Sequence, residues 1–150
     1  MPHINDAGLA LIKSFEGCVL KVYPDPATGG EPYTGGYGHT GGLKLGQPVT
    51  QEQADEWLEQ DLYKFENGVN YLCEEPLNSN QFSALVCFAY NVGLSALAGS
   101  TIMRLINEKH ADQAAAHFGS WIYADLQIMP GLVRRRAAEA ALFSKDPHHG

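Results

Sequence analysis

Three side chains between residues 16 and 34 have the types and spacing that suit hydrolysis of a glycosidic bond. Glu16 and Asp25 lie nine residues apart, and Thr34 opens a glycine-rich stretch. Glycosidases use two carboxyl groups: one donates a proton to the leaving oxygen, and the other stays ionised and activates water or supports the sugar cation. The residues alone also allow a plainer interpretation, in which Asp25 is a turn residue and Glu16 a surface acid.

Two other chemistries are weaker alternatives. Cys18 and His39 raise the possibility of a cysteine peptidase. No Asn or Asp that would orient the histidine is identifiable, and Cys18 alternates with residues that suit a buried strand face. The six histidines include no metal-spaced pair such as H-E-x-x-H, and His148 and His149 lie in the C-terminal tail. We therefore expect no metal site and no cofactor.

The elements that position the two acids are expected to be a short helix, a strand and a turn. Residues 6–16 show helical spacing of apolar side chains after a capping residue, and Gly17 ends the helix. Residues 18–23 favour a strand, and prolines and glycines then form a turn. Glu16 therefore falls at a helix end and Asp25 in the turn after a strand, and a side chain at either position can enter a cleft.

The rest of the chain is mainly helical in pattern. Thr50 and Gln53 form a capping box for a long amphipathic helix that continues to about residue 73. A second capping box, at Asn78 and Gln81, opens a helix so apolar that we expect it at the centre of the main core, ended by Gly93. Further helices are expected near 101–108, 111–119 and 131–143. The prediction is an α+β, mainly helical fold with one small sheet.

Composition excludes several classes of protein. The chain has 150 residues, which suits a single domain, and its 45% hydrophobic content argues against disorder. The net charge of −7 provides no fold-wide basic field for nucleic acid. No apolar run approaches the ~20 residues of a membrane span, and no basic segment precedes the first apolar stretch, so we expect no signal peptide. The three cysteines, Cys18, Cys73 and Cys87, are expected to be reduced thiols.

Positive charge is concentrated in "VRRRAAE" at residues 133–139. On a helix, Arg134, Arg135 and Arg136 span about 200°, so they cannot all face one way. We expect one of them near Glu16 and the others in solvent.

Several segments resemble, in the right order, the phage-type lysozymes, the endolysin muramidase family. They are "FEGCVLKVYPD", "YTGGYGHT", "VTQEQADEWLEQDL", "LNSNQFSALVCFAYNVG", "GSTIMRLIN" and "MPGLVRRRAAEAALF". The resemblance covers nearly the whole chain. The spacer "PATGGEPY" between Asp25 and Thr34 is longer than is usual in the family.

The resemblance assigns roles to individual residues. It implies that Glu16 is the general acid and that Asp25 and Thr34 together act on the water. It implies a structural pair between His39 and Asp61. It also implies that three further residues contact the substrate or shape the cleft floor: Gly36, Tyr37 and Asn91.

The resemblance also implies an architecture and an activity. The architecture is one lysozyme-like domain over 1–150, with a small lobe at about 14–55, a linking helix at about 51–73, a helical lobe at about 76–145 packed with the N-terminal helix, and a cleft between the lobes. The activity is that of a monomeric endolysin that hydrolyses the β-1,4 bond between N-acetylmuramic acid and N-acetylglucosamine in peptidoglycan, with inversion.

The resemblance further implies accumulation in the host cytoplasm and holin-dependent release to the cell wall, with no nucleic-acid partner and no stable membrane insertion. Two alternatives stay open. One is a lytic transglycosylase that cuts the same bond and leaves an anhydro product, and the other is a catalytically silent glycan-binding module.

Overall fold

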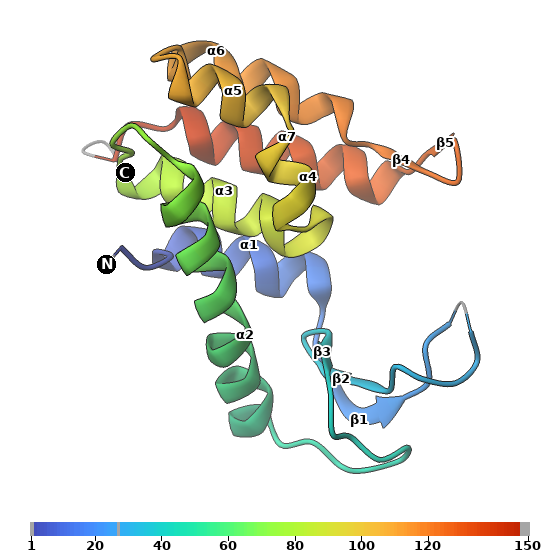
Figure 1. The fold of residues 1–150 in the computed structure, drawn as a ribbon. Helices are drawn as coiled ribbons and strands as arrows, with labels where there is room; N and C mark the ends of the chain where they lie inside the picture. The colour runs from blue at the N-terminus through green and yellow to red at the C-terminus, as the bar shows by residue number, and fades with distance from the viewer. Residues whose placement is uncertain (1, 27, 148–150) are drawn as a thin grey trace. The chain divides into compact units, whose positions relative to one another are not determined.

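The computed structural model describes residues 2–26 and 28–147, which fold into two compact units. The smaller unit is Glu16–Lys64, and the larger unit combines the chain up to Phe15 with the chain from Phe65 onward. The boundary falls inside the long helix α2 (Gln51–Leu72), whose first part belongs to the smaller unit and whose last part belongs to the larger one (Figure 1).

The smaller unit is built on a three-stranded antiparallel sheet in the order β1-β2-β3. The strands are β1 (Val19–Tyr23), β2 (Thr34–Gly36) and β3 (His39–Thr40). The first part of α2 supplies much of its apolar core, which includes Val22, Tyr37, Val49, Ala54, Leu58 and Leu62. Thr50 caps α2 as predicted, since its hydroxyl accepts a hydrogen bond from the backbone N–H of Gln53 at 3.0 Å.

The larger unit is helical. Its helices are α1 (Asp6–Glu16, up to Phe15), α3 (Ser79–Val92), α4 (Leu94–Ala98), α5 (Thr101–Asn107), α6 (Ala111–Ala114), the 3-10 helix Ala115–Ser120 and α7 (Pro130–Ser144). Helix α3 runs between α1 and α7 (Figure 1) and has nine buried residues, so it forms the centre of the core as predicted. Its capping box and its end at Gly93 also agree with the sequence prediction.

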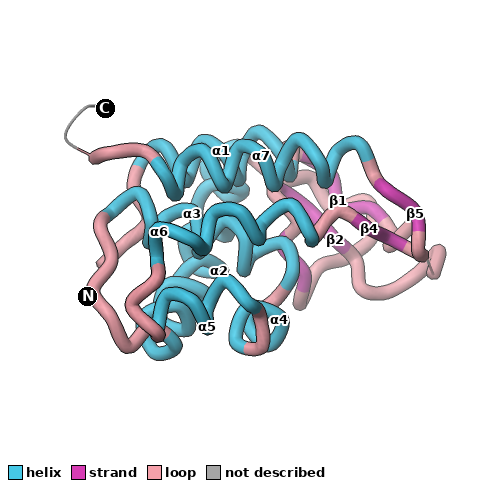
Figure 2. The backbone as a smooth tube through the Cα atoms, turned by 90° about the horizontal axis from the view of Figure 1, so that it is seen from above, coloured by secondary structure: helices cyan, strands magenta, loops and turns pink. Residues whose placement is uncertain are grey.

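Two elements of the larger unit differ from the prediction. Helix α4 was not expected, because no capping signal separates it from α3 beyond Gly93. A hairpin of β4 (Tyr123–Ala124) and β5 (Gln127–Ile128) precedes α7 (Figure 2). Its two turn residues, Asp125 and Leu126, both have positive φ. The usual sign of such a turn is an Asn-Gly or Asp-Gly pair, and here leucine stands in the place of the glycine.

Within the described residues, none of the helices combines the length and the apolar character that crossing a bilayer requires.

Candidate active site

The strand pair β1–β2 positions the three side chains that the sequence singled out. Glu16 is the last residue of α1, and Gly17, with φ of 69°, turns the chain toward β1. Asp25 follows the other end of β1 after one proline. A five-residue strand spans roughly 13 Å at ~3.3 Å per residue, so the two acids begin from opposite ends of one strand.

The register of the sheet brings Thr34 to the Asp25 end of that strand. Thr34 pairs with Tyr23, two residues before Asp25, while Gly36 pairs with Val19, three residues after Glu16. The hydroxyl of Thr34 donates to the carbonyl of Pro32 at 3.3 Å. Its oxygen can therefore still accept a hydrogen bond from a water molecule.

A closed loop holds Asp25. Its N–H donates to the carbonyl of Gly30 at 2.9 Å, and its carbonyl accepts from the N–H of Gly29 at 2.7 Å. The carboxylate oxygen Oδ1 accepts from the N–H of Thr28 at 3.3 Å. These contacts fix the Asp25 carboxylate in a turn.

Gly36 is required by packing inside the smaller unit. Its φ is 62°, and a Cβ atom placed on it would lie 3.2 Å from the Cβ of Ala54 on α2 and 3.5 Å from the ring of Trp57. The backbone of β2 therefore lies close against α2 at Gly36.

Tyr37 is also buried in the smaller unit, with 8% of its surface exposed. Its hydroxyl accepts a hydrogen bond from Nε2 of Gln51 at 3.1 Å. Tyr37 therefore connects the β2–β3 turn to the beginning of α2.

His39 and Asp61 are brought together. Nδ1 of His39 lies 2.8 Å from Oδ2 of Asp61, and the side chains are 16% and 30% exposed. The imidazole stacks on Trp57 with 4.6 Å between ring centroids and 15° between the planes. The pair joins β3 to α2.

No hydrogen bond joins Cys18 to His39 in the described part of the chain. The thiol of Cys18 lies 3.8 Å from Oε1 of Gln51, and His39 is engaged by Asp61. The described residues contain no group of three or more His, Cys, Asp or Glu side chains that could hold a metal ion. His148 and His149 lie outside the described residues.

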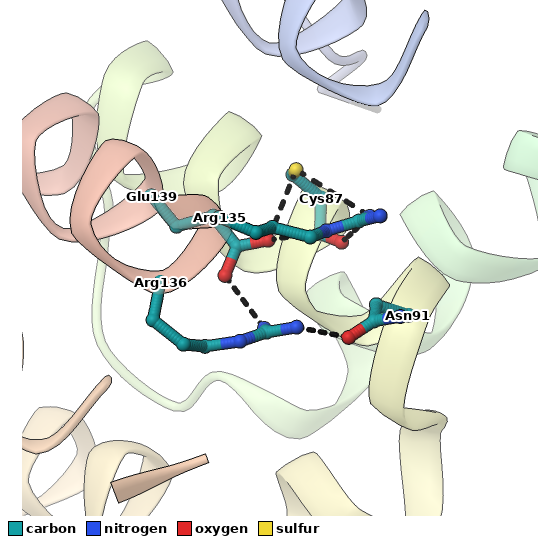
Figure 3. Close-up of polar contacts among 5 residues, drawn as sticks. All are labelled: Cys87, Asn91, Arg135, Arg136 and Glu139. Atoms are coloured by element: carbon teal, nitrogen blue, oxygen red, sulfur yellow. Dashed lines mark hydrogen bonds and ion pairs between the residues drawn. The ribbon is translucent and has the colours of Figure 1, made fainter. Parts of the chain in front are cut away.

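The larger unit contains a buried polar cluster formed by Cys87, Arg135, Arg136 and Glu139 (Figure 3). One carboxylate oxygen of Glu139 accepts from Nε of Arg135 and from the Cys87 thiol, both at 3.1 Å. The other accepts from Nη1 of Arg136 at 2.6 Å. Arg135 also donates to the carbonyl of Cys87 at 3.0 Å.

This cluster corrects the expectation that two of the three arginines are solvated. Arg135 and Arg136 are 3% and 1% exposed, and Arg134 alone is exposed. Burial raises the pKa of the Glu139 carboxyl, and the two guanidinium groups oppose that shift. Burial also raises the pKa of the Cys87 thiol and lowers that of Arg136. The sequence signal was the position of Glu139, three and four residues after the two arginines, which suits helical ion pairs.

Asn91 lies in the larger unit, near the end of α3. Its side-chain oxygen accepts a hydrogen bond from Nη2 of Arg136 (Figure 3). The Arg136 guanidinium is also held over the ring of Phe88, 4.8 Å from the centroid. The amide NH2 group of Asn91 can donate to another molecule.

Comparison with known proteins assigns the chain to a family. Residues 13–139 match the family described as phage lysozyme. The chain belongs to the phage lysozyme family. The sequence-based recognition and the α+β, mainly helical fold are both confirmed.

Relatives of this chain include endolysins from several phages. It is 39% identical over 149 residues to the endolysin of Salmonella phage P22, covering 95% of this chain and 99% of the relative. It is 44% identical over 141 residues to the endolysin of Bacillus phage PZA, covering 94% of this chain and 55% of the relative. The chain thus spans about half the length of the Bacillus phage PZA and B103 endolysins.

Solved structures share the fold. The muramidase domain of SpmX from Asticaccaulis excentricus matches with a TM-score of 0.89 and 38% identity, covering 97% of this chain and 100% of that one. A variant of P22 lysozyme matches with a TM-score of 0.85 and 38% identity, with the same coverage.

Proposed function

We propose that this phage lysozyme is an endolysin that hydrolyses the β-1,4 bond between N-acetylmuramic acid and N-acetylglucosamine in bacterial peptidoglycan. The observation that carries the proposal is the arrangement around the strand pair β1–β2. Glu16 precedes β1, Asp25 follows it, and the register of β2 brings Thr34 to the Asp25 end. Relatives described as endolysins and a structural neighbour described as a muramidase domain support it.

In the proposed reaction, Glu16 donates a proton to the glycosidic oxygen as the bond breaks. Asp25 and Thr34 hold a water molecule, and Asp25 accepts a proton from it as the water attacks the anomeric carbon from the opposite face. The product is then inverted. Such a mechanism needs carboxyl groups ~6.5–9.5 Å apart, against ~5–5.5 Å for direct attack by the second carboxylate. The strand that separates Glu16 from Asp25 favours the wider spacing.

The remaining predicted residues support this machinery in different ways. Gly36 is the last residue of β2 and Tyr37 follows it, and the burial of both favours a role in supporting the strand that carries Thr34. His39 and Asp61 hold β3 on α2. Asn91, whose side-chain oxygen is oriented by Arg136, donates its amide N–H to a carbonyl or hydroxyl oxygen of the glycan.

The proposed target sets where the protein acts. It is made in the host cytoplasm, reaches the cell wall through a holin pore, and works there as a monomer on glycan strands. Family membership supports the wall as the target.

A single variant tests the proposed reaction. Glu16→Gln keeps the shape of the side chain and cannot donate the proton, so we expect release of reducing ends from purified walls to fall by at least ~100-fold. Glu59→Gln, an exposed acid on α2, removes the same charge and should retain activity. Near-normal activity of Glu16→Gln would remove Glu16 from the mechanism.

Product analysis separates the alternatives. Mass spectrometry of the digested wall should show reducing N-acetylmuramic acid ends, the product of hydrolysis. Anhydromuramic ends would identify a lytic transglycosylase. Wild-type protein that pellets with walls but releases no ends would identify a glycan-binding module.

A further inference from the structure

The smaller unit has a groove whose lining residues have no role in the proposed reaction. It has a volume of about 400 Å³ and is lined by Glu31, Pro32, Tyr33, Gly41, Gly42 and Leu43. We call it the Glu31–Leu43 groove. A volume of this order lies within the range of small-ligand sites, roughly 300–1,000 Å³.

The groove lies beside the proposed reaction centre because of the sheet register. Thr34 pairs with Thr40 across β2 and β3. One wall of the groove immediately precedes Thr34 in the chain, and the other immediately follows Thr40. Both walls therefore leave the sheet at the same end, and a molecule in the groove lies next to Thr34.

The walls of the groove combine one negative charge with apolar surface. Glu31 is the single charged residue among the six that line it, and its side chain is exposed. In the described part of the chain, the Glu31 carboxylate has no hydrogen bond or ion pair, while its backbone carbonyl is fixed by the hydroxyl of Thr28 at 2.9 Å. Tyr33 and Leu43 are half-buried, and nothing lies within 4 Å of the open side of Gly41 or Gly42.

This combination suits a primary ammonium group on an aliphatic chain. The carboxylate of Glu31 would accept its hydrogen bonds, the aromatic ring of Tyr33 would attract the cation, and Leu43 would contact the methylene groups. A sugar hydroxyl can also donate a hydrogen bond to this carboxylate, but only an ammonium group adds an opposite charge to that bond. Peptidoglycan carries the matching group on the diamino acid of its stem peptides wherever that side chain is not cross-linked.

We propose that the Glu31–Leu43 groove binds the free amino group of a stem peptide attached to the glycan strand. The inference rests on the proposed function, since it concerns another part of the same substrate. The groove makes the protein favour uncross-linked regions of the wall, where that amine is available.

Kinetics on two forms of one wall preparation test the proposal. One form keeps its amino groups, and the other is N-acetylated under conditions that spare hydroxyl groups. Wild type should have a KM about three- to five-fold lower on the free-amine wall, the size expected for one exposed charge pair. Glu31→Gln and Tyr33→Leu should reduce this preference, with kcat unchanged. Glu59→Gln, which changes charge outside the groove, should keep it.

The proposal is overturned if wild type shows no preference, or if Glu31→Gln retains it in full. A second measurement does not depend on catalysis. In a titration with a soluble stem peptide, the NMR signals of the Gly41 and Gly42 amides should shift with the free amine and stay still with its N-acetylated form. If no reducing ends are released but these shifts occur, the groove proposal stands and the proposed hydrolysis fails. Equal shifts with both peptides, or none, would reject the groove.

Discussion

His39 is held between two side chains of the same helix: its Nδ1 lies 2.8 Å from Oδ2 of Asp61, and its ring stacks on Trp57. Both partners belong to α2, so His39 fixes β3 to the helix by a polar contact with Asp61 and by ring stacking on Trp57. The smaller unit has short strands, and such a contact matters more there than in a large sheet.

A double-mutant cycle measures the His39–Asp61 contact. We expect His39→Ala and Asp61→Ala to lower the free energy of unfolding, and the double variant to lose less than the sum. The coupling energy should be about 0.5–3 kcal/mol, measured by urea denaturation. Additive losses would show that the contact contributes no coupling.

Glu139 should be the most sensitive acid of the larger unit. Glu139→Ala removes the partner of two buried guanidinium groups, and breaking a buried pair costs about 3–5 kcal/mol of unfolding free energy. The matched control is Glu108→Ala, because Glu108 also pairs with an arginine four residues away, at 2.8 Å, but both side chains are about half exposed. Its loss should be below about 1 kcal/mol. Equal losses of unfolding free energy at the two sites would show that burial does not make the Glu139 ion pairs more costly to break.

Gly36 should tolerate alanine poorly for two separable reasons. The backbone has φ of 62°, and the new Cβ would press on Ala54. Gly46 has φ of 79° with nothing within 4 Å, so Gly46→Ala reports the backbone strain alone. Strain of this kind costs about 1–3 kcal/mol. In urea denaturation, Gly36→Ala should therefore lower the free energy of unfolding by more than Gly46→Ala does. Equal losses of unfolding free energy would mean that α2 shifts to accommodate the new Cβ at no energetic cost.

The first sugar product should be the α-anomer. If Asp25 and Thr34 hold the attacking water, hydrolysis inverts the β-linkage. Proton NMR during early turnover distinguishes the anomers before mutarotation. A burst of β-anomer would mean that Asp25 or another group attacks directly, and the role proposed for Thr34 would be wrong.

Local signals predicted the fold well, and contacts made by distant residues were predicted poorly. The capping box of Asn78 and Gln81 and the end at Gly93 located α3, because such motifs are complete within a few residues. The β4–β5 hairpin was missed because Leu126, which has positive φ, stands where the usual turn signal has a glycine after the aspartate.

For the candidate site, the sequence identified the residues but not their neighbours. Gly36 was recognised as a special position, but only the packed structure shows that α2 is the surface it approaches. The burial of Arg135 and Arg136 was missed because it depends on Cys87 and Asn91, more than forty residues earlier in the chain.

The buried cluster of Figure 3 also determines how α7 sits on α3. Consecutive arginines of α7 bind two points one turn apart on α3: Arg135 binds the carbonyl of Cys87, and Arg136 binds the side chain of Asn91. An interface of apolar side chains alone could slide or rotate with modest loss. Here a slip of one turn, about 5.4 Å, would separate two buried guanidinium groups from their acceptors. The cluster therefore sets the rotational register of the last helix.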